Sequence, residues 1–579
     1  MRKYTPYIFI VGLFLCLYGT LQMRPVRWDL TDDKHYSLSE ASKALLKQTD
    51  APVEVTLLLD GDLNAGFKRL KKATEETISE LGVYAQIKNQ KSKIANTFAD
   101  SLGLRPIVIH ERTQNGKTAQ TTVYPYALMQ YKGRKAVVTL LKNTRGLSGE
   151  ENLNASIENL EFAFMEALHL LTQTETPRIA ILEGHGEPDE AHTYDLMSAL
   201  SKYFQIDRGA LNSDAMNIHA LDGYKAVLIV SPQTAFSEAE RFVIDQYIMR
   251  GGTVLWTLNG VQFSQDVLQR EGFTPIVALD LGLTEMLFRY GVRVNPALVQ
   301  DIQCLPIPVN VSSDPQQPNF QPLPWTYAPL LLTSEGSPVT RNTGQIMSTF
   351  VSPIDAVGGE DGIEKRILLA TSTASRVTAA PGEVDLNDMN PDMQTFVYQY
   401  VPVAVSMEGS FPSAFAHRMV PEGVDSDEPI LKSSPRTRQI VIGSGSILLN
   451  ETQRGQALPM GYDRYSQMQF SNRDFAVNAL LWLTDSEGLI GLREKTVALR
   501  LINDKRAHDE RAKVQAISTI SPVAILALIG GIVFVARKRR YEKSIYNLFV
   551  FGTLYAEYTG TGVTELPPRH GERRGGISV

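Results

Sequence analysis

An uncharged apolar run near the C-terminus constrains this chain more than any other feature. Residues 514–536 read VQAISTISPVAILALIGGIVFVA and are followed by the basic sequence RKRR. A helix of this length covers about 34 Å, and the hydrocarbon core of a bilayer is about 30 Å thick. The run therefore predicts a C-terminal transmembrane helix. The alternative is a buried core helix, which is seldom uncharged for so long.

A second run without charged side chains covers residues 4–23 at the other end of the chain. No small-x-small cleavage motif follows it, and the residues before Cys16 are not the small ones that precede a lipidated cysteine. The pattern predicts an uncleaved N-terminal transmembrane anchor at residues 1–23. A cleaved signal peptide is the alternative.

The basic residues around the C-terminal run predict how the chain crosses the membrane. Positive charge occurs on both sides of the run, but the short RKRR cluster at residues 537–540 counts for more, because long domains translocate largely regardless of charge. The tail at residues 537–579 is therefore expected in the cytoplasm. Two spans place the N-terminus on the same side, so residues 24–513 face outward.

The composition indicates which cellular compartment and which classes of partner to expect. The 57 basic and 63 acidic side chains give a net charge of −6, so nothing indicates nucleic-acid binding. The only two cysteines are Cys16, inside the first run, and Cys304, which therefore has no partner for a disulfide in the outward region. A large animal extracellular protein would usually carry several disulfides. We therefore expect a bacterial inner-membrane protein, with membrane lipid around its spans.

Residues 24–150 are predicted to form a small α/β domain. Strands are expected at residues 53–59, 107–110, 121–124 and 136–141. The sequence GDLNAGFK at residues 61–68 resembles a phosphate-binding loop, but its lysine is one residue late and no Ser or Thr follows. A thioredoxin-like fold is possible here, without redox chemistry, because no cysteine occurs between residues 17 and 303.

Residues 151–300 alternate between strands and helices after a first amphipathic helix at residues 154–171. This alternation predicts a doubly wound, mainly parallel sheet, flavodoxin-like or amidotransferase-like. Residues 301–495 are expected to form a second α/β portion with long loops, and residues 496–513 a juxtamembrane helix. The overall fold class is therefore α/β, with two transmembrane helices flanking a large multi-domain ectodomain.

In a doubly wound sheet, ligands bind beyond the carboxyl ends of the strands. The candidate residues for binding a ligand or partner follow three predicted strands: Gly184, His185, Gly186, Glu187, Ser231 and Asn259. The alternative for the GHGE loop is a tight turn whose histidine bonds to the backbone. No catalytic residue, metal site or cofactor is expected. Ser231 lies between Val230 and Pro232, and proline has no N–H to donate to an oxyanion.

Four passages together resemble the GldG-type family, a gliding-motility-associated auxiliary component of an ABC transporter. They are the GHGE loop, PVAVSMEGSFPSAF, GYDRYSQMQFSNRDFAVNALLWLTD and LREKTVALRLIND before the terminal span. The resemblance covers residues 1–540. It implies a two-span protein of Bacteroidota with a large periplasmic region, working with a separate multi-span permease and a cytoplasmic ATPase. It also implies a role in gliding motility and the associated secretion.

The chain departs from this family in two places. Ser444 and Ser446 stand where the resemblance leads us to expect acidic residues, and the tail from residue 541 extends past the usual end. Three functions stay open for this chain. They are a non-enzymatic transporter subunit that binds partners or cargo, a solute-binding receptor of the cell envelope, and an amidotransferase-like hydrolase using His185 and Glu187.

Overall fold

The computed structural model divides the chain into two units, Met1–Ala498 and Leu499–Val579. It describes residues 38–61, 63–91, 104–112, 118–142, 148–173, 175–211, 216–310, 312, 317, 319–341, 343–359, 362–386, 392–484, 490, 515–516 and 518–539. The predicted anchor at residues 1–23, the juxtamembrane helix at 496–513 and nearly all of the tail lie outside the described residues.

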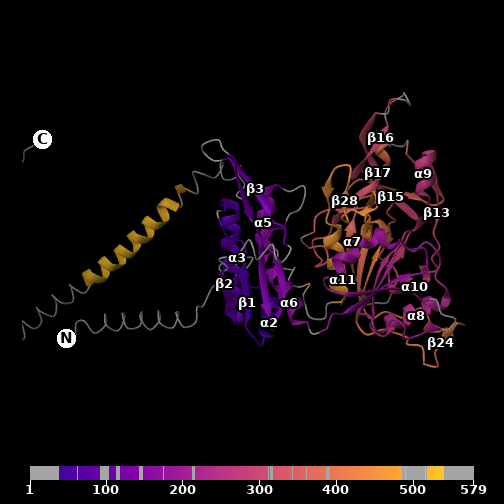
Figure 1. The fold of residues 1–579 in the computed structure, drawn as a ribbon, viewed down its shortest axis with the longest axis horizontal. Helices are drawn as coiled ribbons and strands as arrows, with labels where there is room; N and C mark the ends of the chain where they lie inside the picture. Colours follow the sequence, from indigo (N-terminus) through magenta and orange to yellow (C-terminus); the bar gives the residue numbers. More distant parts are fainter. Residues whose placement is uncertain are drawn as a thin grey trace, which may run out of the picture. The chain divides into compact units, whose positions relative to one another are not determined.

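The first part of the larger unit is a small α/β region (Figure 1). Its elements are α2 (Glu40–Lys47), β1 (Val53–Leu57), α3 (Ala65–Tyr84), β2 (Ile87–Lys91), β3 (Ile107–Arg112), β4 (Thr118–Val123), β5 (Tyr126–Tyr131) and β6 (Arg134–Thr139). The sheet order is β2-β1-β5-β6, with β1 parallel to β2 and β5 antiparallel to both its neighbours, while β3 and β4 form a separate hairpin. The thioredoxin-like assignment of this region stays a prediction.

Helix α3 begins at the sequence that resembles a phosphate-binding loop. The side chain of Asn64 accepts a hydrogen bond from the N–H of Phe67, so the helix N-terminus is capped by its own chain. Phe67, Leu70, Ile78 and Leu81 recur at helical spacing and are buried. This stretch is therefore a capped amphipathic helix.

The single helix expected at residues 154–171 is two helices, α5 (Gly149–Glu158) and α6 (Leu160–Thr172), and that prediction was wrong. The break falls at Asn159, a poor helix former, whose N–H donates to the carbonyls of Ala155 and Ser156. A capping box of Ser148 and Glu151 starts α5 earlier than expected. Most of α6 is buried, as in a helix that packs on several sides.

The second part of the larger unit is built on one large sheet in the order β16-β17-β20-β23-β25-β11-β10-β7-β8. These strands are β7 (Arg178–Glu183), β8 (Gln205–Ala210), β10 (Ala226–Val230), β11 (Thr253–Thr257), β16 (Cys304–Asn310), β17 (Phe320–Thr333), β20 (Glu364–Ala370), β23 (Pro402–Gly409) and β25 (Thr437–Ile442). The helices α7 (Glu190–Leu200), α8 (Glu238–Met249) and α11 (Asn472–Thr484) accompany it.

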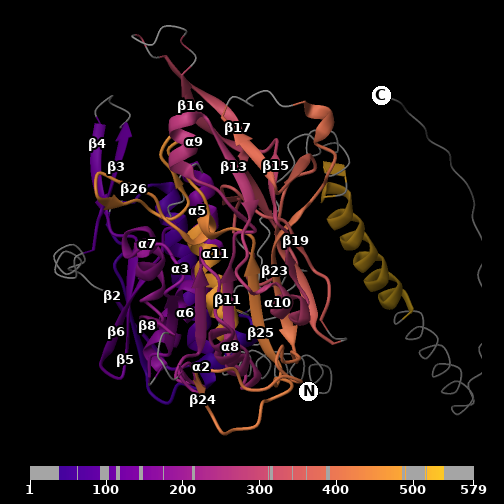
Figure 2. The same cartoon turned by 90° about the vertical axis from the view of Figure 1, so that its right-hand side faces the viewer.

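The expectation of a mainly parallel sheet is corrected, because the sheet is mixed. Strands β8, β7, β10, β11 and β25 are parallel, whereas β16, β17, β20 and β23 each pair antiparallel with the next strand in the sheet order. The predicted boundary at residue 300 falls inside this sheet, since β25 pairs with β11 (Figure 2). A parallel pair needs no nearby partner in sequence, so residues 439–442 could be recognised as a strand but not assigned to this sheet.

Shorter elements surround the sheet. They are β9 (Met216–Asn217), β12 (Val261–Gln262), α9 (Gln265–Glu271), β13 (Phe273–Ala278), α10 (Thr284–Tyr290), β14 (Arg293–Val294), β15 (Ala297–Asp301), β18 (Ile346–Met347), β19 (Ile354–Asp355), β21 (Ser375–Ala379), β22 (Gly382–Asp385), η1 (Met393–Thr395), β24 (Val424–Asp425), η2 (Gly445–Leu448), β26 (Thr452–Gln453), β27 (Gln456–Ala457), β28 (Tyr462–Asp463) and β29 (Met468–Gln469). Those after residue 300 lie in the portion that was expected to carry long loops.

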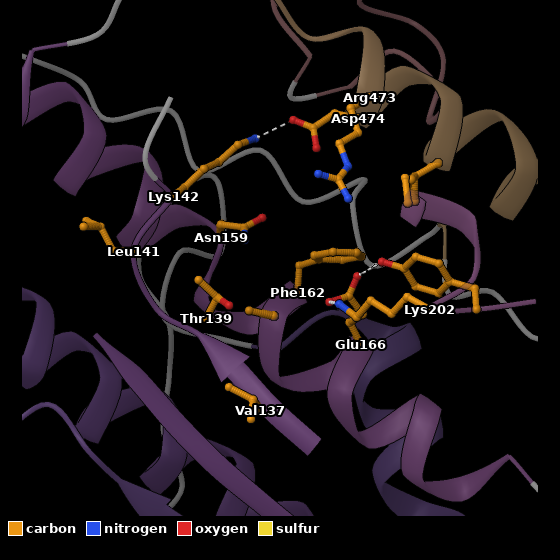
Figure 3. A pocket seen from close by; sticks show the side chains of 14 residues that line it. Val137, Thr139, Leu141, Lys142, Asn159, Phe162, Glu166, Lys202, Arg473 and Asp474 are labelled. Carbon is orange, nitrogen blue, oxygen red and sulfur yellow. Dashed lines mark hydrogen bonds and ion pairs between the residues drawn. The ribbon is translucent and has the colours of Figure 1, made fainter. Parts of the chain in front are cut away.

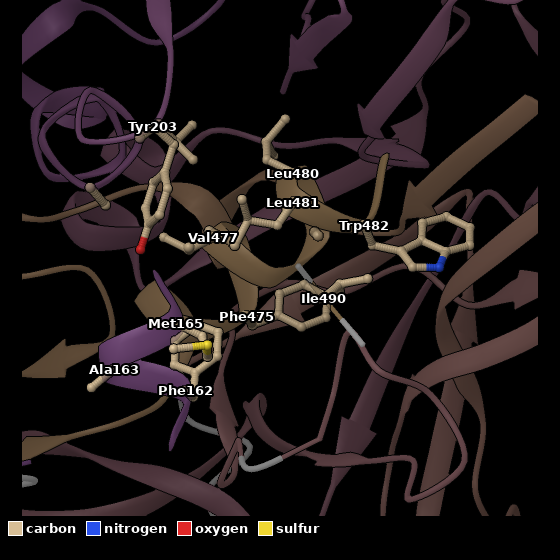
Figure 4. Close-up of a cluster of buried hydrophobic side chains, with 14 of the residues drawn as sticks. Phe162, Ala163, Met165, Tyr203, Phe475, Val477, Leu480, Leu481, Trp482 and Ile490 are labelled. Atoms are coloured by element: carbon tan, nitrogen blue, oxygen red, sulfur yellow. The ribbon is translucent and has the colours of Figure 1, made fainter. Parts of the chain in front are cut away.

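The parallel strands are buried on both faces, and successive side chains enter two different cores. Ile181, Leu228 and Leu255 belong to the core that includes residues of α6, α7 and α11. Their neighbours Leu182 and Ile229 belong to the core that includes residues of α8 and α10. Figure 4 shows part of the first core, where Phe162 and Met165 of α6 lie by Phe475 of α11. This period of two is the pattern of a sheet covered by helices on both sides.

The smaller unit contains a helix, Ser518–Arg539, with a mean hydropathy of 2.4 and no buried part. Its length and composition suit a membrane span, in agreement with the predicted C-terminal span. Among the residues that the structure describes, it is the one helix of this kind.

A buried carboxylate fixes the segment after β23 to the helices beneath it. Asp245 of α8 is fully buried and accepts hydrogen bonds from the Tyr290 hydroxyl at 2.7 Å, the Ser413 hydroxyl at 2.7 Å and the Ala414 N–H at 2.8 Å. Burial raises the pKa of the Asp245 carboxyl, although these bonds act in the opposite direction. The network holds the sequence SFPSAF against α8 and α10.

We expect replacement of Asp245 by Asn to change how stability depends on pH. The folded chain binds the carboxyl proton more tightly than the unfolded chain, because the pKa is raised on folding. The free energy of unfolding of the wild type should therefore fall, relative to that of Asp245→Asn, as the pH rises above about 4. Denaturant titrations at several pH values measure this difference. Asp427→Asn at an exposed position is the control. A free energy of unfolding of the wild type that rises with pH relative to that of Asp245→Asn would contradict the prediction.

Candidate functional site

The six predicted site residues lie at the carboxyl ends of three neighbouring parallel strands. Residues 184–187 follow β7, Ser231 follows β10, and Asn259 lies two residues beyond β11. Gly184 and Gly186 have φ of 114° and 77°, and Ser231 has φ of 51°. These are left-handed conformations, which glycine adopts without strain and serine rarely adopts. The structure therefore brings the six residues to one edge of the sheet, and their role in binding stays a prediction.

The imidazole of His185 is buried between two carboxylates and an aromatic ring. Its Nε2 lies 3.2 Å from Glu240 Oε1, and its Nδ1 lies 3.5 Å from Glu187 Oε1. The ring stacks on Phe236 with centroids 3.8 Å apart. Glu240 is also the N3 residue of α8, where its side chain forms the capping box with the N-cap residue Ser237. The histidine ring thus faces side chains that come from two different helix entries.

The backbone of the GHGE loop forms a tight turn around this ring. The N–H of His185 donates to Glu187 Oε2 at 2.7 Å, and its carbonyl accepts from the N–H groups of Gln233 and Thr234. A Cβ added at Gly186 would lie 3.2 Å from the Cβ of Gln233, so this glycine permits the close approach of the two loops.

Two buried polar atoms in this turn have no hydrogen-bond partner among the described residues. They are His185 Nδ1 and Glu187 Oε1, the pair that lies 3.5 Å apart. A buried polar atom without a partner costs about 1–3 kcal/mol. Within the described part of the chain, no group of three His, Cys, Asp or Glu side chains has the arrangement of a metal site.

Ser231 and Asn259 connect β10 and β11 to the glycine-serine loop after β25. The Asn259 amide nitrogen donates to Ser231 Oγ at 3.1 Å, and its carbonyl oxygen accepts from the N–H of Gly445 at 3.1 Å. The Gln233 amide also donates to Ser231 Oγ, at 3.3 Å. The serine hydroxyl therefore contacts two side-chain amides, which are not general bases.

Residues 348–353 cover this edge of the sheet, and no sequence motif predicted that contact. The hydroxyls of Ser444 and Ser446 both donate to the carbonyl of Thr349, and the Thr349 N–H donates to Ser446 Oγ. The Ser352 N–H donates to the carbonyl of Gly443 at 2.7 Å. The two serines thus hold a covering segment in place. The six predicted residues line neither the pocket that includes Phe162 and Arg473 nor the pocket that includes Asp222 and Arg250.

We expect Gly445→Ala to destabilise the fold through Ser231. A Cβ at position 445 would lie 2.3 Å from Ser231 Cβ and 2.4 Å from its Oγ, which is overpacking and costs about 1–3 kcal/mol. Adding Ser231→Gly should recover part of the loss, because it removes both atoms. Urea unfolding of the two single variants and the double variant would measure the coupling. Gly336→Ala, with open space around its Cβ, is the control; a double variant no more stable than Gly445→Ala would contradict the explanation.

The comparisons with known proteins agree with the resemblance found in the sequence. A family model described as an ABC-type uncharacterized transport system matches residues 176–479, more than half of the chain. A model described as a domain of unknown function, DUF7088, matches residues 32–130. A search of curated proteins found no match. The solved mmIFT52 N-terminal domain is similar over 53% of this chain and 98% of its own, at 16% identity and a TM-score of 0.31. The first match extends from the strand before the GHGE loop into α11, and the chain therefore belongs to the family of ABC-type transport system auxiliary proteins.

Proposed function

We propose that this chain is a non-enzymatic, membrane-anchored auxiliary subunit of an ABC transporter complex. We propose further that the complex is linked to gliding motility or the associated secretion in Bacteroidota. The observation that carries the proposal is the family match over residues 176–479, on a chain that also has the apolar helix Ser518–Arg539. The family gives the role in ABC transport, and the helix suits association with a membrane. The GldG-type identity of the sequence passages supports the link to gliding.

The proposed partners are a multi-span permease and a separate cytoplasmic ATPase, both in or at the inner membrane. The GDLNAGFK sequence of this chain lacks a P-loop lysine in register, and its helix N-terminus is capped by Asn64. ATP would therefore be hydrolysed by the separate subunit. The small region would be a thioredoxin-like domain without redox cysteines, and the parallel half of the large sheet a flavodoxin-like or amidotransferase-like core.

The proposal of a non-enzymatic role rests on the environment of Ser231. Its hydroxyl accepts from the amides of Gln233 and Asn259, and residue 232 is a proline, which has no N–H to stabilise an oxyanion. We propose instead that the loop at residues 184–187, with Ser231 and Asn259, binds a partner. The position of these residues at the carboxyl ends of β7, β10 and β11 supports this, because ligands of parallel sheets bind at that edge.

We expect the region before the C-terminal helix to lie in the periplasm. Met419 is 89% exposed, so a cysteine there is accessible to a labelling reagent. In a chain without Cys16 and Cys304, Met419→Cys should react with a membrane-impermeant maleimide added to spheroplasts. Ser544→Cys, in the predicted cytoplasmic tail, should react only after lysis. Labelling of position 544 before lysis, with position 419 protected, would reverse the proposed orientation.

We expect purification of the tagged chain from native membranes to recover a permease and a nucleotide-binding subunit, identified by mass spectrometry. Recovery of neither in a detergent that preserves other transporter complexes would count against the proposed function.

His185→Ala removes the ring between Glu187 and Glu240 and should reduce recovery of both partners while the chain stays folded. Unchanged recovery with this variant would remove the GHGE loop from the partner surface and leave the transporter role in place.

A further inference from the structure

A pocket of about 300 Å³ lies where β6, α6, the end of α7 and the start of α11 meet (Figure 3). It is away from the GHGE loop and is lined by none of the six predicted site residues. Its volume is at the lower end of the range for small-molecule sites in proteins. Its lining combines three cationic side chains with an apolar floor.

The polar side of the pocket includes a guanidinium with unused hydrogen-bonding capacity. Arg473 is half exposed, and the one ion-pair partner it has among the described residues is Asp195, with Nη1 3.7 Å from Oδ1. This distance is longer than a hydrogen bond, so the five N–H donors of the guanidinium are available. Figure 3 shows the guanidinium pointing from α11 into the pocket above Phe162. The fork geometry of arginine suits a carboxylate or phosphate held by two parallel bonds.

The two lysines of the pocket are already paired. Lys202 Nζ lies 2.7 Å from Glu166 Oε2, while Glu166 Oε1 accepts from the Tyr203 hydroxyl. Lys142 Nζ lies 3.3 Å from Asp474 Oδ2. With Asp195 behind Arg473, the three cations of the pocket face three carboxylates, so the preference for an anion depends on the Arg473 donors that point into the pocket.

The floor of the pocket is apolar and rigid. Phe162 and Ala163 come from α6, Ala199 from α7 and Val477 from α11, and all four are buried in the same core. Asn159, at the break between α5 and α6, also lines the pocket. A ligand that fits these surfaces has one anionic group for Arg473 and a small apolar body for the floor. This describes an organic carboxylate better than an inorganic ion, which would leave the floor uncovered.

We propose that this pocket binds a small organic carboxylate, with the carboxylate on Arg473 and the apolar body over Phe162. The proposal goes beyond the auxiliary role, because it assigns the ectodomain a ligand of its own. Two sources share this chemistry: the C-terminal carboxylate of a short apolar peptide, and a short acyl chain. Because the lining residues come from the small region, from α6 and from α11, a bound ligand would contact three separate stretches of the chain.

The test is isothermal titration calorimetry, in which each of three probes is titrated into the full chain in lipid nanodiscs. The first is N-acetyl-alanyl-leucine, the second is its C-terminal amide, and the third is hexanoate. The free acid should bind at least about 10-fold more tightly than the amide, as expected for charge-assisted hydrogen bonds to arginine. Hexanoate binding as tightly as the peptide acid would identify the acyl source, and weaker hexanoate binding the peptide source.

Arg473→Gln should weaken binding of the preferred acid by about 10- to 100-fold. Arg289→Gln is a matched control, because Arg289 is also partly exposed and, within the described ranges, has one long ion pair, to Glu285 at 3.8 Å. Circular dichroism melting of both variants establishes that they are folded. Equal binding of acid and amide, binding that persists in a folded Arg473→Gln chain, or no binding of either acid would overturn the proposal. None of these outcomes depends on the permease or the ATPase, so the proposed function is tested separately.

Discussion

The larger unit depends on a set of parallel strands whose successive side chains enter different cores. In β10, Leu228 faces the core of α6, α7 and α11, while Val227 and Ile229 face the core of α8 and α10. A shift of one residue in register would exchange the two faces of the strand. Because β7, β10, β11 and β25 are all fixed in this way, the loops at their carboxyl ends are fixed as well. The positions of His185, Ser231, Asn259 and the serines after β25 follow from that register.

Local patterns were sufficient to predict much of this arrangement. The alternation expected within residues 151–300 is present as β7, α7, β8, β10, α8 and β11, and the apolar run near the C-terminus is a helix suited to a membrane. Each of these signals depends on residues a few positions apart. The rule that ligand loops follow parallel strands also brought residues from three separate loops to one edge of the sheet.

Contacts between distant residues were beyond that reasoning. Thr349 bonds to serines nearly a hundred residues away and covers the edge that the sequence suggested was open. The antiparallel half of the sheet requires pairing of β23 with β25 across a long intervening loop. The pocket beside Arg473 joins stretches separated by more than three hundred residues, and no local pattern in any of them indicated that the others lie beside it. Side-chain periodicity predicts which face is buried, not which partner buries it.

Helix α6 belongs to the small region and to the large one at the same time. Its Glu161 accepts from the Ser39 N–H and the Ser42 hydroxyl of the α2 start, while its Phe164 and Met165 lie in the same core as Phe475 of α11. An element shared in this way opens only when both of its neighbours loosen. The backbone amides of α6 should therefore exchange with solvent as slowly as those of the central strands, and any pull applied to the first hundred residues would be transmitted directly to the sheet.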